Sequence, residues 1–198
     1  MGTVKQELPR TLFHITGGIF LAVLGYHLPG IWNRVALGAI LFAAVAVEAA
    51  RKFSPPFNRF TRKSLGIFMR ASEHDGVTGT PAYAGGVFLA FVLFPREIAA
   101  ASLVPLIIGD RAAVLAGKGF GRIKIGAKTL EGSIACFTAS LGAYLILVKL
   151  AGPFSGVSLP VLLGASLTGT LAEALPRPFD DNLTIPLAVG VFLKIAIS

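Results

Sequence analysis

Seven apolar stretches along the chain are long enough to cross a lipid bilayer, or nearly so, and they restrict the fold more than any other feature. They lie near residues 11–28, 35–50, 81–94, 98–116, 133–152, 157–175 and 183–197. A transmembrane helix needs about 20 predominantly apolar residues, so the third and seventh stretches are short. The sequence predicts an all-α fold, a polytopic integral membrane helix bundle of about seven transmembrane helices.

The composition agrees with a membrane protein. Of the 198 residues, 54% are hydrophobic and only 14% are charged, whereas soluble domains carry roughly 25% charged residues. The single cysteine, Cys136, lies inside an apolar run, which excludes a disulfide framework and a cysteine-based metal site. The sequence has no internal repeats and no separate soluble domain, so we expect one transmembrane domain over residues 1–198.

The basic residues are distributed unevenly between the two sides of the predicted bundle. If the amino terminus is cytoplasmic, the residues left outside, among 18 lysines and arginines, are Arg34, Arg96, Lys149 and Lys194. Positively charged loops favour the cytoplasm, so this bias predicts a cytoplasmic amino terminus and a cytoplasmic active site. The same loops explain the net charge of +8. The chain has no nucleic-acid-binding signature, and we expect no nucleic acid partner.

The longest segment between predicted spans, residues 51–80, mixes basic residues with apolar ones such as Phe60 and Leu65 after Pro55 and Pro56. This mixture fits a short helix that lies on the cytoplasmic leaflet. It fits a solvated basic cytoplasmic loop equally well. The sequence leaves both alternatives open.

A polar segment, residues 109–133, has the sequence GDRAAVLAGKGFGRIKIGAKTLEGS. Asp110 and Arg111 fall inside the fourth apolar stretch, where ionisable groups are costly and often functional. A buried structural pair between these two is the alternative, although neighbouring residues on a helix point about 100° apart and do not face each other. Arg111 is instead expected to share a helix face with Lys118, seven residues further on.

Glycines and cations crowd the rest of this segment. Gly117, Gly119 and Gly121 allow the backbone to turn tightly and to approach a ligand closely. The cations close by are Lys118, Arg122, Lys124 and Lys128. Together they predict a nucleotide-binding segment over residues 109–133, in which amides and cations hold a polyphosphate and Asp110 holds a divalent metal. A basic loop after a glycine-rich helix end is the alternative.

Further carboxylates lie at the same predicted membrane face. Glu131 opens the fifth span, where an acid would offset the helix dipole, but its place beside the cations supports a metal or catalytic role at least as well. Glu173 ends the sixth span, and residues 180–182 open the seventh. Helix capping explains one of these groups and leaves their convergence unexplained. Arg10 and His14 share one face of the first span, and His14 is either an interfacial histidine or a substrate contact.

Three motifs along the chain resemble a known family. They are Gly109-Asp110-x-x-Ala113, Gly117-x-x-Phe120-Gly121 and Lys128-Thr129-x-Glu131-Gly132-Ser133. The series is similar to the motif shared by the CTP-dependent lipid-alcohol kinases, which comprise dolichol kinases, phytol kinases and CTP-dependent diacylglycerol kinases. The likeness extends to Arg10-x-x-x-His14 near the start and to Glu173 with Asp181-Asn182-x-x-x-Pro186 near the end.

The resemblance implies transfer of the γ-phosphate of CTP to the hydroxyl of a membrane lipid alcohol, which would be a polyprenol or dolichol, a phytol-like isoprenoid or diacylglycerol. Mg²⁺ or another divalent cation would be the cofactor. The implied catalytic residues are Asp110 and Glu131, and the implied metal ligands are Asp110, Glu131, Glu173 and Asp181. The implied nucleotide and phosphate contacts are Gly117, Lys118, Gly119, Gly121, Arg122, Lys124, Lys128 and Thr129. The implied substrate-side residues are Arg10, His14 and Asn182, and Glu73, which the charge distribution places on the cytoplasmic side, is a further substrate-side candidate.

Two other functions stay open. Phosphatidate cytidylyltransferases, which form CDP-lipids, carry a comparable motif series, but they typically end with a K-R-x-x-x-x-K-D signature that this chain lacks. A small transporter would also use intramembrane Asp and Arg with glycine-rich helices, although here the polar groups gather at one face. The compact chain favours a prokaryotic cytoplasmic membrane, with the ER membrane as the eukaryotic counterpart. A homodimer is compatible with the sequence.

Overall fold

The structure is a computed structural model that describes residues 4–150, 156–175 and 180–197. Each of the seven predicted stretches corresponds to a helical segment. These are α1 (Val4–His27), α2 (Trp32–Phe53), α4 (Thr80–Leu93), α5 (Arg96–Ser102) with α6 (Asp110–Phe120), α7 (Leu130–Leu150), α8 (Leu159–Ala174) and α9 (Asp181–Ile197). The all-α prediction is therefore confirmed. Residues 151–152 of the fifth stretch, and the predicted cytoplasmic Arg177, lie outside the described residues.

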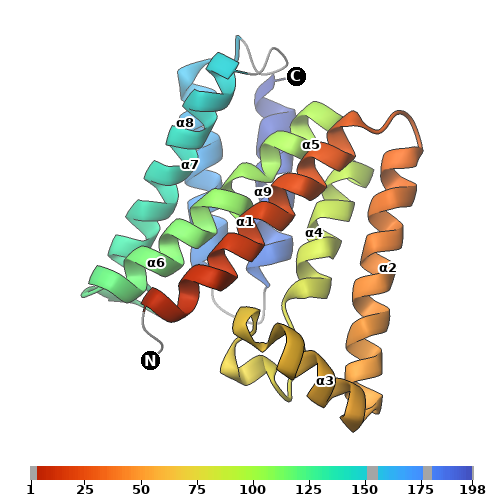
Figure 1. Cartoon of the computed structure of the whole chain (residues 1–198). Helices are drawn as coiled ribbons and strands as arrows, with labels where there is room; N and C mark the ends of the chain where they lie inside the picture. Colours follow the sequence, from red (N-terminus) through yellow and green to blue (C-terminus); the bar gives the residue numbers. More distant parts are fainter. Residues whose placement is uncertain (1–3, 151–155, 176–179, 198) are drawn as a thin grey trace.

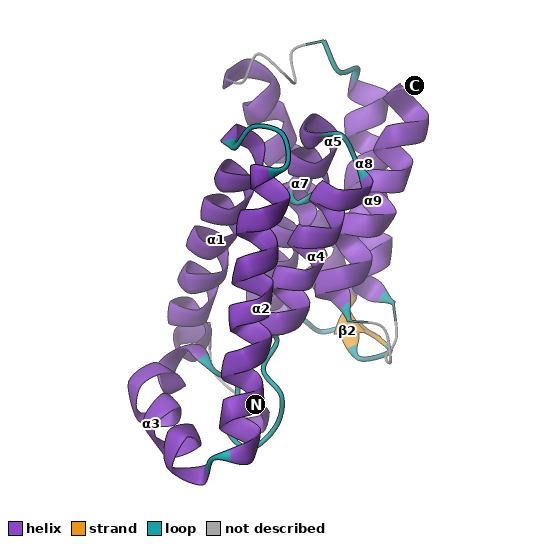
Figure 2. Ribbon diagram, turned by 90° about the vertical axis from the view of Figure 1, so that its right-hand side faces the viewer, coloured by secondary structure: helices purple, strands orange, loops and turns teal. Residues whose placement is uncertain are grey.

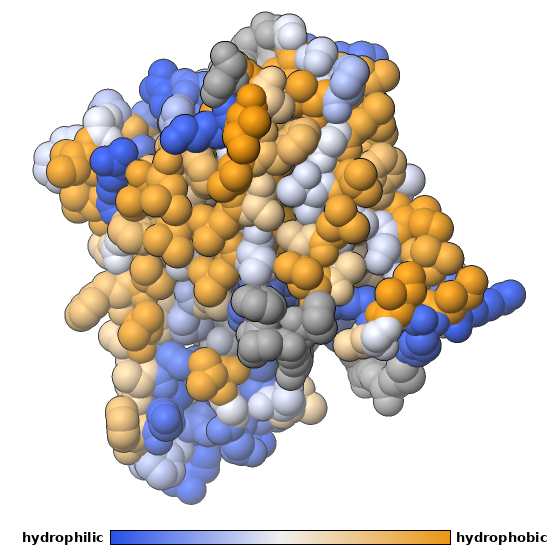
Figure 3. Space-filling view, turned by 180° about the vertical axis from the view of Figure 1, so that it is seen from behind, coloured by the Kyte–Doolittle hydropathy of each residue, from blue (hydrophilic) through white to orange (hydrophobic). Residues whose placement is uncertain are grey.

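The outer surface of the bundle is apolar. The helical segments long and apolar enough to cross a membrane are Glu7–His27, Trp32–Phe53, Arg96–Phe120 and Leu130–Leu150, and Thr80–Leu93 and Leu159–Ala174 are shorter apolar helices. Figure 3 shows a broad hydrophobic band, with hydrophilic residues gathered toward the ends of the molecule. Large side chains such as Phe42, which is 75% exposed, face outward. Apolar surfaces of this extent are typical of contact with lipid.

The segment from α5 through α6 forms the centre of the bundle. A π-helical turn, η3 (Pro105–Gly109), joins the two helices. Along the series α2, α4, α9, α8, α7 and α6 each helix packs on the next, and α1 lies along α5 and α6 (Figures 1 and 2). Leu103 and Leu106 are fully buried against residues such as Phe91 and Val189. This packing fixes the start of α6, and with it Asp110, next to the core.

Residues 51–80 contain a short helix, as one of the two sequence alternatives predicted. The elements are α3 (Pro55–Leu65), η1 (Gly66–Phe68) and η2 (Ala71–Glu73). The hydroxyl of Ser54 accepts a hydrogen bond from the backbone N–H of Phe57 at 3.4 Å, and a proline follows directly, which is a favourable helix start. Nη2 of Arg51 donates to the carbonyl of Glu73 at 2.8 Å and holds the far end of the segment. The segment lies across one end of the bundle (Figure 1).

Candidate active site

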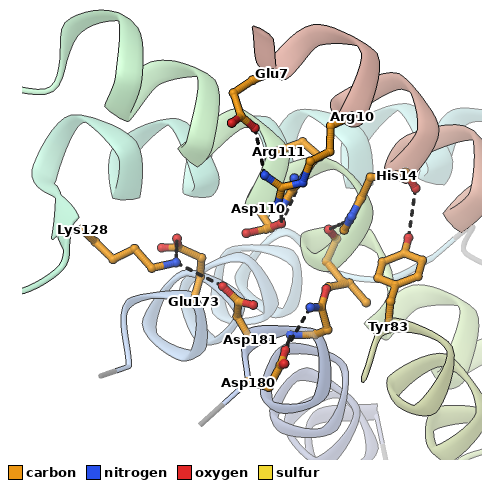
Figure 4. Close-up of polar contacts among 12 residues, drawn as sticks. Glu7, Arg10, His14, Tyr83, Asp110, Arg111, Lys128, Glu173, Asp180 and Asp181 are labelled. Carbon is orange, nitrogen blue, oxygen red and sulfur yellow. Dashed lines mark hydrogen bonds and ion pairs between the residues drawn. The ribbon is translucent and has the colours of Figure 1, made fainter. Parts of the chain in front are cut away.

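Charged side chains from five elements gather at one end of the bundle (Figure 4). They are Glu7, Arg10 and His14 from α1, Asp110 and Arg111 from α6, Lys128 from strand β2 (Lys128–Thr129), Glu173 from α8 and Asp181 from α9. Burying a charged side chain costs free energy unless the charge is paired with an opposite charge or bound to a ligand. Such a concentration in a chain with few charged residues marks this end as the candidate active site.

Asp110 and Arg111 form a buried ion pair at the start of α6. Nε of Arg111 donates to Oδ2 of Asp110 at 2.8 Å, and Nη2 donates to the same oxygen. Only 1% of Asp110 and 3% of Arg111 are exposed. The structure thus contains the buried pair that the sequence left as an alternative, because the long arginine side chain folds back to the preceding carboxylate. Nη1 of Arg111 is buried without a hydrogen-bond partner among the described residues, so it remains a donor for a bound anion.

Glu7 joins α1 to α6, and the motifs in the sequence did not reveal it. Its Oε2 accepts from Nη1 of Arg10 at 3.0 Å, and its Oε1 accepts from Nζ of Lys118 at 2.6 Å. The spacing of Glu7 and Arg10, three residues apart in a charge-poor span, is a signal that could have found it. Glu7 thereby places a predicted phosphate-binding lysine beside a predicted substrate-side arginine.

Lys128 joins the carboxylates at the ends of two helices. Its Nζ donates to Oε1 of Glu173 and, at 3.2 Å, to Oδ2 of Asp181. Burial lowers the pKa of Lys128, but the hydrogen bond to Glu173 and the charges of Glu173 and Asp181 outweigh it and raise the pKa above its ordinary value. Lys128 therefore stays protonated at neutral pH. Figure 4 shows this group next to the carboxylate of Asp110.

Thr129 and Glu131 anchor the hairpin that carries Lys128. Oε1 of Glu131 accepts from the backbone N–H groups of Arg122 at 2.9 Å and Ile123 at 3.2 Å. Oγ1 of Thr129 accepts from the backbone N–H of Gly132 at 3.1 Å, which satisfies a free donor at the start of α7. Glu131 thus ties the chain after α6 to the start of α7. The side chains of Arg122 and of Lys124, in strand β1 (Lys124–Ile125), are exposed.

The glycine-rich run is a helix end, and the prediction of a tight turn within it is wrong. Gly117 and Gly119 lie inside α6, and Gly121 follows it with φ −62°. A Cβ at Gly117 would lie 2.9 Å from Oγ1 of Thr129, so the missing side chain lets α6 pack closely on the hairpin. The turn that requires a positive φ is at Gly126, φ +59°, between β1 and β2.

A cavity of about 340 Å³ lies beside the charged groups. Its polar lining includes Arg10, His14, Glu73, Arg111 and Asn182, and its apolar lining includes Phe13, Leu21, Ile40 and Phe68. The substrate-side residues that the resemblance implied therefore line one cavity, together with Glu73, the further candidate from the predicted topology. The carboxylate of Glu73 is held in place by the backbone N–H of Arg70, at 2.7 Å from Oε2. The cavity therefore offers hydrogen-bonding side chains on one part of its lining and apolar side chains on another.

The residues implied as metal ligands differ in how well they fit an ion. Among the described residues, no three His, Cys, Asp or Glu side chains form a ready-made metal site. Within the part of the chain that the structure describes, Oε2 of Glu173 is nevertheless buried without a hydrogen-bond partner, and Asp181 shares Lys128 with Glu173. Mg²⁺ is usually bound by one or two carboxylates together with substrate phosphates, so this pair fits the ion. Glu131 fits less well, because backbone amides already occupy its carboxylate.

Comparison with known proteins identifies the family of the chain. The CTP-dependent diacylglycerol kinase 1 of Schizosaccharomyces pombe is 31% identical over 204 residues, which cover 96% of this chain and 93% of that protein. The chain belongs to the CTP-dependent lipid kinase family. A lipid kinase of the same name from Saccharomyces cerevisiae is 28% identical, over 98% of this chain and 74% of its own length. No protein-family model and no solved structure matches the chain. The family resemblance of the motifs is thus confirmed.

Proposed function

We propose that this member of the family transfers the γ-phosphate of CTP to the hydroxyl of diacylglycerol. The observation that best supports the proposal is the cavity, which is lined by Arg111, the neighbour of Asp110 in the first motif, and by apolar side chains. A cavity of this kind suits a lipid whose chains stay among the helices while its hydroxyl reaches the charged end. Diacylglycerol is preferred to polyprenol and phytol because the relatives that match nearly the whole chain are named diacylglycerol kinases.

The cations of the site can neutralise the negative charge of the phosphates in this reaction. Phosphoryl transfer depends on positioning and on neutralising the charge of the transferred group. Nη1 of Arg111 has no hydrogen-bond partner among the residues that the structure describes, and Asp110 fixes the direction of the guanidinium. Glu7 holds Arg10 and Lys118 together, so both can turn toward an anion that enters between α1 and α6. We assign these three cations to the phosphates and give Asp110 the role of orienting Arg111.

Mg²⁺ would be held by Glu173 and Asp181, with Asp110 as a third carboxylate nearby. When bound, the ion would neutralise charge on the β- and γ-phosphates. The side chain of Lys128 is 30% exposed, so its ammonium can also reach a phosphate from the position it shares with these carboxylates. Oε2 of Glu173, which has no hydrogen-bond partner in the described part of the chain, supports this assignment.

The test measures which phosphate of CTP is transferred and which lipid receives it. Purified protein receives Mg²⁺ and CTP labelled at either the γ or the α phosphate, with diacylglycerol, polyprenol, phytol and phosphatidate offered separately. We expect lipid-extractable label only from the γ position, on diacylglycerol. Label from the α position on phosphatidate would identify a cytidylyltransferase. Label from the γ position on another alcohol alone would change the substrate, and no label on any lipid would contradict a kinase.

We further propose seven spans, with the amino terminus and the active site in the cytoplasm. The positive charge of residues 51–80 and 118–128 supports this orientation. Single cysteines at Lys63 and Arg122, both exposed, in a Cys136→Ser background, should react with an impermeant thiol reagent only from the cytoplasmic side. A cysteine at Lys149, near the opposite end of α7, is the matched control and should react only from outside. The reverse pattern would invert the topology.

A further inference from the structure

The ring of His14 has one nitrogen committed to the protein and one that is free. Nε2 lies 3.0 Å from the carbonyl oxygen of Leu106. A carbonyl oxygen only accepts hydrogen bonds, so Nε2 carries the proton and Nδ1 of the neutral ring is an acceptor. Within residues 4–150, 156–175 and 180–197, Nδ1 has no hydrogen-bond partner. His14 also lines the cavity that contains Arg10 and Arg111.

The carbonyl that binds the ring of His14 belongs to the π-helical turn η3. The backbone N–H of Asp110 donates to the carbonyl of Pro105, five residues back, which is the hydrogen-bond spacing of a π-helix. The carbonyl of Leu106, inside this turn, accepts the hydrogen bond from the ring of His14. Such turns within α-helices are often found at functional sites. The hydroxyl of Tyr83 also donates to the backbone carbonyl of His14 at 3.1 Å, with ring centroids 4.3 Å apart (Figure 4).

The carboxylates near the cavity are less suited to accept a proton. Asp110 is paired with Arg111 through two hydrogen bonds. Glu173 is paired with Lys128, and Glu73, the carboxylate that lines the cavity, accepts hydrogen bonds from the backbone N–H groups of Arg70 and Gly79. A base must have a free lone pair within reach of the substrate hydroxyl. Among these groups, Nδ1 of His14 meets that condition in the cavity itself.

We propose that His14 is the general base of the reaction, an inference that rests on the proposed kinase function. Nδ1 takes the proton of the lipid hydroxyl as its oxygen attacks the γ-phosphorus. The bond between the γ-phosphorus and the β,γ-bridging oxygen breaks, and the electron pair leaves with CDP. The products are the lipid phosphate monoester, CDP and an imidazolium, which then returns its proton to water. Nε2 keeps its hydrogen bond to Leu106 throughout and holds the ring in place.

The test separates a base from a structural histidine. In His14→Gln, the amide nitrogen can replace Nε2 and still donate to the Leu106 carbonyl, but the side chain has no basic nitrogen. We expect kcat to fall by about 10²–10⁴-fold, the usual contribution of a general base. The KM for CTP and the unfolding midpoint should stay close to those of the wild type. His27→Gln, at the other end of α1, is the matched control and should retain full activity.

A second variant gives an independent readout. In His14→Ala, added imidazole should restore part of kcat in proportion to the concentration of its neutral form. If His14→Gln keeps the wild-type kcat, or if both variants lose CTP binding and stability together, the assignment as a base is overturned while the kinase function stands. If the wild type itself transfers no γ-phosphate to any lipid alcohol, the proposed function fails and this inference fails with it.

Discussion

Replacement of Asp110 by Asn is expected to lower kcat for lipid phosphorylation by about 10²–10³-fold, the usual effect of losing one fixed electrostatic contact. The carboxylate holds Nε and Nη2 of Arg111, and an amide would no longer fix that guanidinium by charge. The arginine would also stay buried without its counter-ion, and breaking such a pair costs about 3–5 kcal/mol. The kcat of purified, monodisperse variant and its unfolding midpoint measure the two effects.

Glu97→Gln is the matched control for this variant. Arg96 and Glu97 are also consecutive on the same helical segment, and Nε of Arg96 donates to Oε1 of Glu97 at 2.9 Å, but this pair is exposed. Exposed ion pairs contribute little to stability, so kcat and the unfolding midpoint should remain at wild-type values. Wild-type kcat in Asp110→Asn would contradict any role of this carboxylate in the reaction.

Replacement of Lys128 by Met is expected to reduce kcat/KM for CTP by about 10²-fold, because an ammonium that neutralises phosphate charge is lost. The change also leaves the buried carboxylate of Glu173 without its partner, at a cost of about 2–3 kcal/mol. Met keeps the unbranched shape of Lys, so packing changes little. Steady-state kinetics with varied CTP, together with denaturant unfolding, measure both effects.

The other lysine of the hairpin is the control for this prediction. Lys124 pairs across the strands with Thr129, and its side chain is exposed. Lys124→Met should therefore leave stability unchanged and reduce kcat/KM far less than Lys128→Met. Equal losses in the two variants would mean that general positive charge matters, and that the position of Lys128 between Glu173 and Asp181 does not.

The helices and the family could be predicted from residue patterns alone. Long apolar runs satisfy their backbone hydrogen bonds as helices in lipid, so the segments that became α1, α2, α4, α7, α8 and α9 were determined locally. The motif around Asp110 and Lys128 was sufficient to indicate the family that the relatives confirm. Even the convergence of Glu173 and Asp181 was predictable, because each stands at the end of a helix on the same side.

Only the tertiary structure decided which of these groups are partners. The pair of Glu7 and Lys118 joins residues far apart in the chain, and no local pattern specifies which cation a buried carboxylate meets. Gly117 allows α6 to pack closely on Thr129, and the position of a glycine in the sequence does not predict such a contact. The hydrogen bond between His14 and the Leu106 carbonyl joins α1 to a π-helical turn in the centre of the bundle. Charges buried among helices must find partners across the packing interfaces, so the site is determined by how the helices dock on one another.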